Sequence, residues 1–255
     1  ASINAVEFGT GDKAVKIGGE NVFPLYSFDA AIENAPKVGI EITDFGMEHE
    51  PECIKKYYEG CATLADMARK AASMEGVDFL SFRMEGGDPN GANKSTEELI
   101  GELKEIADAV DLPLVVCGCK NVEKDAELFS KAAEALNGKN AVILSAKEEN
   151  YKTVGAAAGL AYKQVVGAES AVDINLAKQL NVLISQLGVD SKSVVMNVGT
   201  AAVGYGFEYV ISTMDRVKAA ALQQGDANLQ MPIITPVASE AWGVKEAMAS
   251  ETDAP

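Results

Sequence analysis

The fold class of this chain is decided by the segment of residues 79–116, which reads FLSFRMEGGDPNGANKSTEELIGELKEIADAVDLPLVV. It begins and ends with short apolar runs, Phe79–Phe82 and Leu114–Val116, which are typical of buried strands. The segment between them predicts an amphipathic helix, in which Ser95 is the N-cap and Glu98 its capping-box partner. Its apolar stripe consists of Leu99, Leu103, Ile106 and Val110. Two apolar strands separated by a helix predict a parallel sheet that helices cover.

The same alternation continues along most of the chain. Five further strands are predicted from short apolar runs: Val38–Ile42, Ala141–Leu144, Ser170–Val172, Val194–Met196 and Ile233–Ile234. Helices are predicted over Asp125–Leu136 and Ile174–Leu187. Asn121 and Asn150 are predicted helix N-caps, and left-handed helix ends are predicted at Gly138, Gly167 and Gly188. This unbroken succession favours a TIM (β/α)8 barrel over a doubly wound sheet.

The first residues follow a different pattern. Residues 3–9 and 13–18 alternate apolar and polar side chains around a Thr-Gly-Asp turn, which predicts a β-hairpin. We therefore expect an N-terminal hairpin and loop, residues 1–36, packed on a barrel formed by residues 37–255. Seven barrel strands are predicted where eight close a barrel, and an open ring leaves two unpaired edges. The expectation is that the last strand–helix unit lies beyond residue 255, or that another segment supplies it.

Composition narrows the classes of function. The 255 residues are 47% hydrophobic and carry a formal charge of −16, so neither nucleic acid nor a membrane is the expected partner. With no signal peptide and no long apolar run, a cytoplasmic location is expected. The four cysteines have spacings of neither a zinc ribbon nor a ferredoxin, which favours free thiols over metal ligands.

Functional groups of a barrel follow each strand, at its carboxyl-terminal rim. The predicted binding residues at this rim are mostly amides, hydroxyls and small charged groups: Asp44, Arg83, Asp88, Asn90, Asn150, Asp173, Asn175, Asn197, Thr200 and Thr235. Such groups suit hydrogen bonding to the edge of a large ligand. No catalytic residue and no metal-ligand set is predicted, and His49, the one histidine of the sequence, is interpreted as a surface residue.

Several motifs point to a known family. They are Gly18–Asn21 with Pro24 and Phe28, Val38–Asp44, Asp88–Gly91, Cys117–Cys119 with Asn121, Glu148–Lys152, Asp173–Asn181, Gly204–Tyr209 and Met231–Ile234. In this order, and over essentially the whole chain, the sequence resembles the small (delta) subunit of the corrinoid iron–sulfur protein, the acetyl-CoA decarbonylase/synthase delta subunit family. It departs from the family at Arg83, where lysine is expected, and at Asn197–Ala202, where a Thr-Thr-Gly-Gly-like run is expected.

The resemblance implies a TIM barrel that pairs with the large subunit of the corrinoid iron–sulfur protein. That partner is expected to carry the [4Fe–4S] cluster and a cobamide (corrinoid), whose face the barrel rim would cap. The heterodimer would be a methyl carrier between a methyltetrahydrofolate or pterin methyltransferase and acetyl-CoA synthase, in the reductive acetyl-CoA (Wood–Ljungdahl) pathway of anaerobes. This chain would then be a non-catalytic subunit, and a rim without histidine would leave the cobalt free.

Two enzyme classes remain as alternatives. A pterin-dependent corrinoid methyltransferase shares the barrel, and Asp173 and Asn197 would then bind the pterin ring. A barrel lyase or aldolase would use Lys120 as its Schiff-base residue.

Overall fold

The structure is a computed structural model that describes residues 1–23, 28, 30, 32–241 and 243–249. Pro24 of the motifs above, and residues 250–255 of the predicted barrel, lie outside the described residues.

A six-stranded parallel sheet forms the centre of the molecule. Its strands are β3 (Gly39–Thr43), β4 (Phe79–Arg83), β5 (Leu114–Cys117), β6 (Val142–Ala146), β7 (Val165–Glu169) and β8 (Val194–Asn197). Each strand pairs in parallel with the next one along the chain, so the spatial order equals the sequence order. This order confirms the predicted α/β class and is that of a barrel wall.

The fifth predicted barrel strand is wrong in position. The strand occupies Val165–Glu169, whereas Ser170–Val172 forms a turn in which Ala171 and Val172 have φ of 45° and 68°. A left-handed backbone at two successive residues cannot continue a strand. Gly167, predicted as a helix end, lies inside this strand, while Gly138 and Gly188 have the predicted left-handed backbone.

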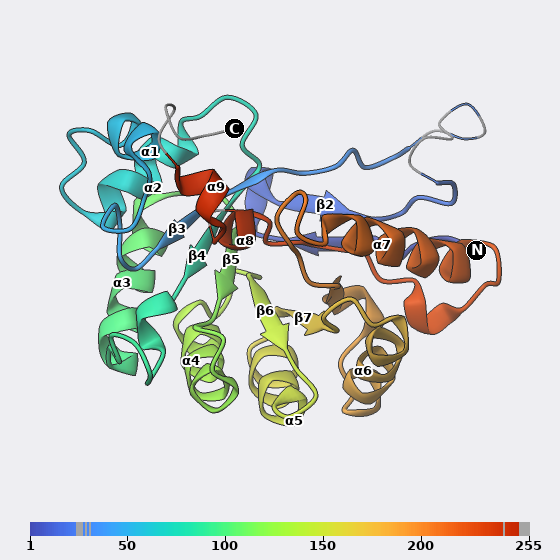
Figure 1. The fold of residues 1–255 in the computed structure, drawn as a ribbon. Helices are drawn as coiled ribbons and strands as arrows, with labels where there is room; N and C mark the ends of the chain where they lie inside the picture. The colour runs from blue at the N-terminus through green and yellow to red at the C-terminus, as the bar shows by residue number, and fades with distance from the viewer. Residues whose placement is uncertain (24–27, 29, 31, 242, 250–255) are drawn as a thin grey trace.

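Helices cover the outer face of the sheet (Figure 1). They are α1 (Glu52–Tyr57), α2 (Leu64–Ala72), α3 (Thr96–Ala109), α4 (Val122–Ala135), α5 (Tyr151–Val154), α6 (Ile174–Gln186) and α7 (Phe207–Leu222). Helix α5 continues as a π-helix over Gly155–Ala161, and two short helices, α8 (Ala238–Ala241) and α9 (Lys245–Met248), end the described chain. Short 3-10 turns lie at Gly11–Lys13, Glu85–Gly87, Ser191–Ser193 and Ala227–Leu229.

Side-chain caps begin four of the longer helices, α2, α3, α4 and α6, whereas α7 begins after Gly206 without one. Ser95 accepts a hydrogen bond from the Glu98 amide at 3.1 Å, and Asn121 accepts one from the Lys124 amide at 3.0 Å, which confirms both as N-caps. The reciprocal bond of the predicted capping box, from the Ser95 amide to the Glu98 carboxylate, does not form in the described residues. Asn150 occupies the predicted N-cap position of α5, but its side chain makes no capping hydrogen bond. Its amide instead accepts from the Lys147 amide and donates to the Val122 carbonyl, which joins the β6–α5 turn to α4.

Apolar packing lies on both faces of the sheet. Leu80, Phe82 and Leu103 belong to the larger cluster, between strands and helices. A second cluster fills the inner face, and there the predicted hairpin of β1 (Val6–Phe8) and β2 (Val15–Ile17) packs against the first residues of the strands. Phe8 meets Phe79 edge to face at 5.6 Å. The hairpin therefore covers the amino-terminal end of the strands and leaves their carboxyl-terminal end for a binding site.

The wall of strands is open on one side. Ile233 makes a single parallel bridge to Met196 of β8, and the described residues show no pairing between Ile233–Ile234 and β3. A cavity of about 650 Å³, here called the seam cavity, lies between β3 and residues 232–238, with mostly apolar walls that include Val38, Phe79 and Ile211. In the described part of the chain, no helix combines the length and the apolar character that crossing a bilayer requires.

Candidate functional site

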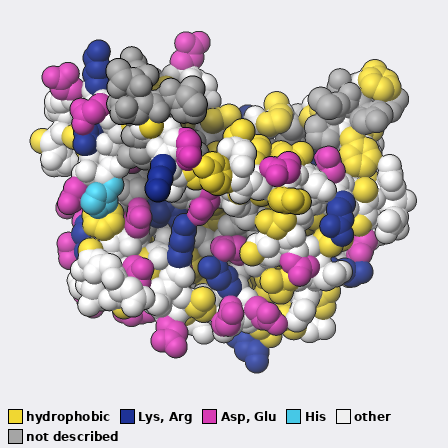
Figure 2. Space-filling view, in the orientation of Figure 1, with side chains coloured by type: hydrophobic (Ala, Val, Ile, Leu, Met, Phe, Trp, Pro, Cys, Tyr) yellow, Lys and Arg dark blue, Asp and Glu magenta, His cyan; other side chains and the backbone are white. Residues whose placement is uncertain are grey.

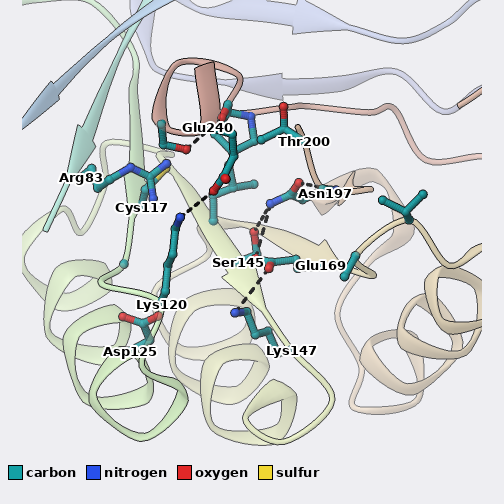
Figure 3. Close-up of a pocket in the computed structure, with 17 residues that line it drawn as sticks. Arg83, Cys117, Lys120, Asp125, Ser145, Lys147, Glu169, Asn197, Thr200 and Glu240 are labelled. Carbon is teal, nitrogen blue, oxygen red and sulfur yellow. Dashed lines mark hydrogen bonds and ion pairs between the residues drawn. The ribbon is translucent and has the colours of Figure 1, made fainter. Parts of the chain in front are cut away.

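A second cavity, here called the mouth, lies at the carboxyl-terminal end of the strands and has a volume of about 300 Å³ (Figure 3). Five consecutive strands each contribute a side chain from their last or next-to-last position: Arg83, Cys117, Ser145, Glu169 and Asn197. Because side chains alternate between the two faces of a strand, matching positions in neighbouring strands point to the same cavity. Arg83 is paired with Cys117 and Glu169 with Asn197, whereas Ser145 lies where β6 shifts its register against β7. The mouth thus follows from strand register together with this local irregularity.

Arg83 is fixed by a buried ion pair. Its Nε donates to Glu41 Oε1 at 3.0 Å and its Nη2 to Oε2 at 2.9 Å, and both side chains are about nine-tenths buried. Burial acts to lower the pKa of Arg83, but the Cys117 sulfur and the Glu41 carboxylate outweigh it, so the pKa is raised. Since a forked pair uses both carboxylate oxygens, Arg83 brings little unbalanced charge to the mouth.

Cys117 lies beside this pair. Burial raises the pKa of its thiol to about 11, and its sulfur lies 3.5 Å from the Ser81 hydroxyl. The thiol is therefore protonated at neutral pH and is a weak ligand for metals, because the thiolate is the ligating form.

A hydrogen-bond network lines the opposite wall of the mouth. Asn197 Nδ2 donates to Ser145 Oγ at 2.9 Å and lies 3.5 Å from Glu169 Oε2, while its Oδ1 accepts from the Gly199 amide. Lys147 Nζ lies 3.3 Å from Glu169 Oε1. These contacts hold the Asn197 and Ser145 side chains in fixed orientations at the surface of the cavity (Figure 3).

The hydroxyl group of Thr200 makes no hydrogen bond within the described residues. Its Oγ1 is buried and has no partner in the structure, although the residue lines the mouth. An unsatisfied buried hydroxyl costs about 1–3 kcal/mol, so a ligand or water that bonds to it would be stabilised there.

The Cys117-Gly118-Cys119 motif has a structural explanation. The Asp125 carboxylate accepts from the Cys119 amide at 2.7 Å and occupies the space where a Cβ on Gly118 would lie. Burial raises the pKa of Asp125. All four cysteines are free, and no group of three or more His, Cys, Asp or Glu side chains in the described residues is placed to hold a metal ion.

Three of the ten predicted binding residues line the mouth: Arg83, Asn197 and Thr200. Two others are buried and act on neighbouring loops. Asp44 accepts from the Gly86 amide at 2.9 Å and pairs with Lys94 at 3.0 Å, which fixes the β4–α3 loop. Asn150 links the β6–α5 turn to α4, as described above.

The remaining five lie outside the mouth. Asp88 accepts from the Asn90 amide in an exposed turn, and Asp173 caps α6 through the amides of Asn175 and Leu176. Asn175 is exposed on the first turn of that helix. Thr235 lines the seam cavity, where its Oγ1 has no partner in the structure.

The sequence reasoning missed several side chains of the site. Glu169 was missed because the fifth strand was placed after it, although the apolar run Val165–Ala168 gives the correct position. Glu41 was overlooked inside an otherwise apolar strand, where a lone carboxylate signals a buried partner. Lys147 and Glu240 become neighbours of the mouth only through tertiary structure.

Comparisons with known proteins agree on one family. Residues 5–252 match the family model described as CO dehydrogenase/acetyl-CoA synthase delta subunit. The chain is 34% identical to the acetyl-CoA decarbonylase/synthase complex subunit delta of Methanothermobacter thermautotrophicus, covering 94% of this chain and 61% of that protein. The subunit delta of Methanopyrus kandleri is also 34% identical, with 93% and 59% covered, and that of Archaeoglobus fulgidus is 32% identical, with 94% and 53% covered.

The chain thus spans between about half and three fifths of the length of these relatives. Among solved structures, a phosphoenolpyruvate phosphomutase from Streptomyces platensis subsp. rosaceus matches with a TM-score of 0.41 and 16% identity, covering 84% of this chain and 79% of that one. That likeness is too low to bear on activity. The family model and these three relatives show that this chain belongs to the CO dehydrogenase/acetyl-CoA synthase delta subunit family.

Proposed function

We propose that this chain is the barrel of the small subunit of a corrinoid iron–sulfur protein, a cytoplasmic methyl carrier. Its mouth would lie against the cobamide that the large subunit holds together with a [4Fe–4S] cluster. The heterodimer would take a methyl group from a pterin methyltransferase and deliver it to acetyl-CoA synthase. One observation carries the proposal: five successive strands end in polar groups whose charges are paired internally, around a hydroxyl that has no partner.

The size of the mouth agrees with a ligand that lies across it. About 300 Å³ is the lower end of the range for small-molecule pockets, so a macrocycle would rest against the opening and would not enter it. Ser145, Asn197 and Thr200 offer hydroxyl and amide groups to the amide side chains at the edge of a corrin. The cobalt supplies the methyl-carrying chemistry when the cobamide is bound.

The residues of this chain would orient that ligand without competing for its metal. The positive charge of Arg83 is balanced by the Glu41 carboxylate, and that of Lys147 by the Glu169 carboxylate. On the face shown in Figure 2, basic and acidic side chains are intermingled, with no large patch of either sign. The Cys117 thiol is neutral, and His49 lies outside the mouth, with its ring 4.8 Å from Phe45. Neither thiolate nor imidazole is thus presented to a metal at the opening.

The geometry favours the two enzyme alternatives less. A pterin site that uses Asp173 and Asn197 together would need both at the mouth. The Asp173 carboxylate instead accepts hydrogen bonds from the first amides of α6. A Schiff-base lysine is usually desolvated, whereas the Lys120 side chain is 60% exposed and paired with Glu240.

Anaerobic co-purification tests the proposal. Co-expressed with the cobamide-bearing large subunit, this chain is expected to elute in a complex that contains stoichiometric cobalt and iron. The isolated chain is expected to bind methyltetrahydrofolate weakly. Tight folate binding by the chain alone, with no complex formed, would favour the pterin-dependent enzyme.

A further inference from the structure

The last described segment of the chain crosses the mouth. Pro236, Ser239 and Glu240 line this cavity together with the strand ends. In Figures 1 and 3 the short helix α8 lies over the carboxyl-terminal ends of the central strands. The described residues among 236–248, here called the cover, therefore occupy the place where a large ligand would meet the mouth.

Two polar contacts attach the cover to the barrel, one on each side of the mouth. Lys120 Nζ, in the β5–α4 loop, lies 2.6 Å from Glu240 Oε1. Tyr205, in the β8–α7 loop, forms a side-chain hydrogen bond with Glu246, which raises the pKa of the tyrosine and lowers that of the carboxylate. The other hydrogen bonds given for the described residues of the cover stay within residues 235–243.

Both attachments are exposed. The Lys120 and Glu240 side chains are 60% and 39% exposed, Tyr205 is 57% exposed, and Glu246 is also exposed. An exposed pair of this kind shifts the equilibrium between the attached and the displaced cover by only about 1.5- to 5-fold. Those residues of the cover whose burial is described include no fully buried side chain, and Val237 is half exposed. Little apolar burial therefore opposes displacement of the cover.

We infer that the cover is a displaceable, autoinhibitory segment: in the free subunit it occupies the mouth, with Glu240 on Lys120, and it leaves when a large ligand docks. The identity of that ligand rests on the proposed function, whereas the displacement rests on the contacts of this chain. Displacement would also release the Lys120 ammonium to face the incoming ligand, where it could bind a carbonyl or carboxylate oxygen.

Access to the mouth measures the displacement directly. Ser145 is buried in the mouth, so a Ser145→Cys variant of the whole chain reports opening through its rate of maleimide labelling, followed by peptide mass spectrometry. The exposed Cys53 calibrates the reagent in the same sample. Adding Glu240→Gln is expected to accelerate labelling of the mouth cysteine about 1.5- to 5-fold, and Tyr205→Phe is expected to act in the same direction.

A matched control separates the cover from general surface electrostatics. Lys131 and Glu134 form a pair at 3.0 Å on α4, with side chains 60% and 52% exposed, so Glu134→Gln removes an equally exposed ion pair elsewhere. It is expected to leave the labelling rate unchanged. Equal labelling rates in the Glu240→Gln, Glu134→Gln and parent proteins would overturn the inference.

A second experiment uses the cobamide-bearing large subunit, and its outcomes distinguish the cover inference from the proposed function. If the cover competes with docking, Glu240→Gln tightens the apparent affinity for the large subunit by the same factor by which it opens the mouth. Faster labelling without any complex would contradict the proposed function and leave the cover inference standing. Complex formation with no effect of Glu240→Gln on labelling or affinity would reject the cover and leave the proposed function standing.

Discussion

The two cavities of the molecule have opposite characters. The mouth, about 300 Å³, is lined by charged and hydrogen-bonding side chains at the ends of five strands. The seam cavity, about 650 Å³, has mostly apolar walls and adjoins the edge of β3 that no other described strand pairs with. Apolar walls gain stability when other apolar groups cover them, whereas paired polar groups gain from a hydrogen-bonding ligand. The mouth is therefore built for recognition and the seam for packing.

One ion pair, one segment and the Leu144 side chain of β6, which lines both cavities, connect the mouth to the seam cavity. Glu41 lines the seam cavity and holds Arg83 of the mouth, and Pro236 of the cover borders both cavities. Changes at these positions should affect both regions, whereas changes elsewhere should affect only one.

The largest effect is expected at the shared ion pair. Arg83→Leu leaves the Glu41 carboxylate buried without a partner and should lower the free energy of unfolding by about 3–5 kcal/mol. The double variant Arg83→Leu/Glu41→Leu should recover much of this loss, because no unpaired charge remains. Urea denaturation of both proteins measures the difference. A single-variant loss below about 1 kcal/mol would mean that water solvates the pair.

Substitutions of apolar side chains should distinguish the tightly packed wall of the sheet from the seam cavity. Leu103 is fully buried between α3 and the sheet, and Leu103→Ala should cost about 2–5 kcal/mol. Ile211 is 43% exposed beside the seam cavity, so Ile211→Ala should cost less than about 1 kcal/mol. Urea denaturation checks both values. Equal costs would show that the seam is as tightly packed in solution as the rest of the core.

The Cys117 thiol should make stability depend on alkaline pH. Its pKa is raised from 9.0 to about 11, so the unfolded chain loses this proton first as the pH rises. The stabilisation is complete below about pH 9 and is lost as the pH rises through about 11. Two pKa units correspond to about 2–3 kcal/mol.

Paired variants isolate this contribution from other titrating groups. Between about pH 8 and 11, the parent protein should lose about 2–3 kcal/mol more unfolding free energy than Cys117→Ala does. Cys53→Ala, at an exposed thiol, should follow the parent. Parallel pH profiles for the parent and Cys117→Ala would contradict burial of the thiol.

An effect smaller in free energy than those at Arg83, Leu103 and Cys117 is expected at the mouth network. Asn197→Asp removes the donor to Ser145 and places a second negative charge beside Glu169. Methyl transfer by the heterodimer should fall about tenfold, which corresponds to about 1.4 kcal/mol. Because Asn197 is buried, urea denaturation of the variant checks that it is folded under the assay conditions. The matched variant Asn175→Asp, exposed in the first turn of α6, should transfer normally. Equal rates for both would argue against a ligand at the mouth.

Local sequence patterns predicted much of the fold. The strand–helix–strand unit of residues 79–116 needs only short-range periodicity, and β4, α3 and β5 formed close to the predicted positions. Strand β7 was misplaced because Gly167 was interpreted as a helix end, while its real role is to let Leu144 of β6 pack closely against the backbone.

The site was harder to predict because it depends on register between strands. Asn197 is opposite Glu169 and Arg83 reaches Glu41, and neither relation is visible in the local sequence. Polar residues that follow strands, such as Asp173 and Asp88, instead satisfy nearby backbone amides. Residues of this type commonly cap helices and form turns, so rim position alone could not show which of them line the mouth.

The most direct test of the central claim is a magnetic distance measurement between the mouth and the cobalt. A nitroxide at Thr200→Cys, in a chain with Cys53 and Cys61 replaced by serine, should lose signal intensity when the large subunit carries paramagnetic Co(II) cobamide. A nitroxide at Thr10→Cys, in the hairpin turn at the opposite end of the strands, should keep its signal. Equal signals at both positions in an intact heterodimer would contradict a cobamide at the mouth.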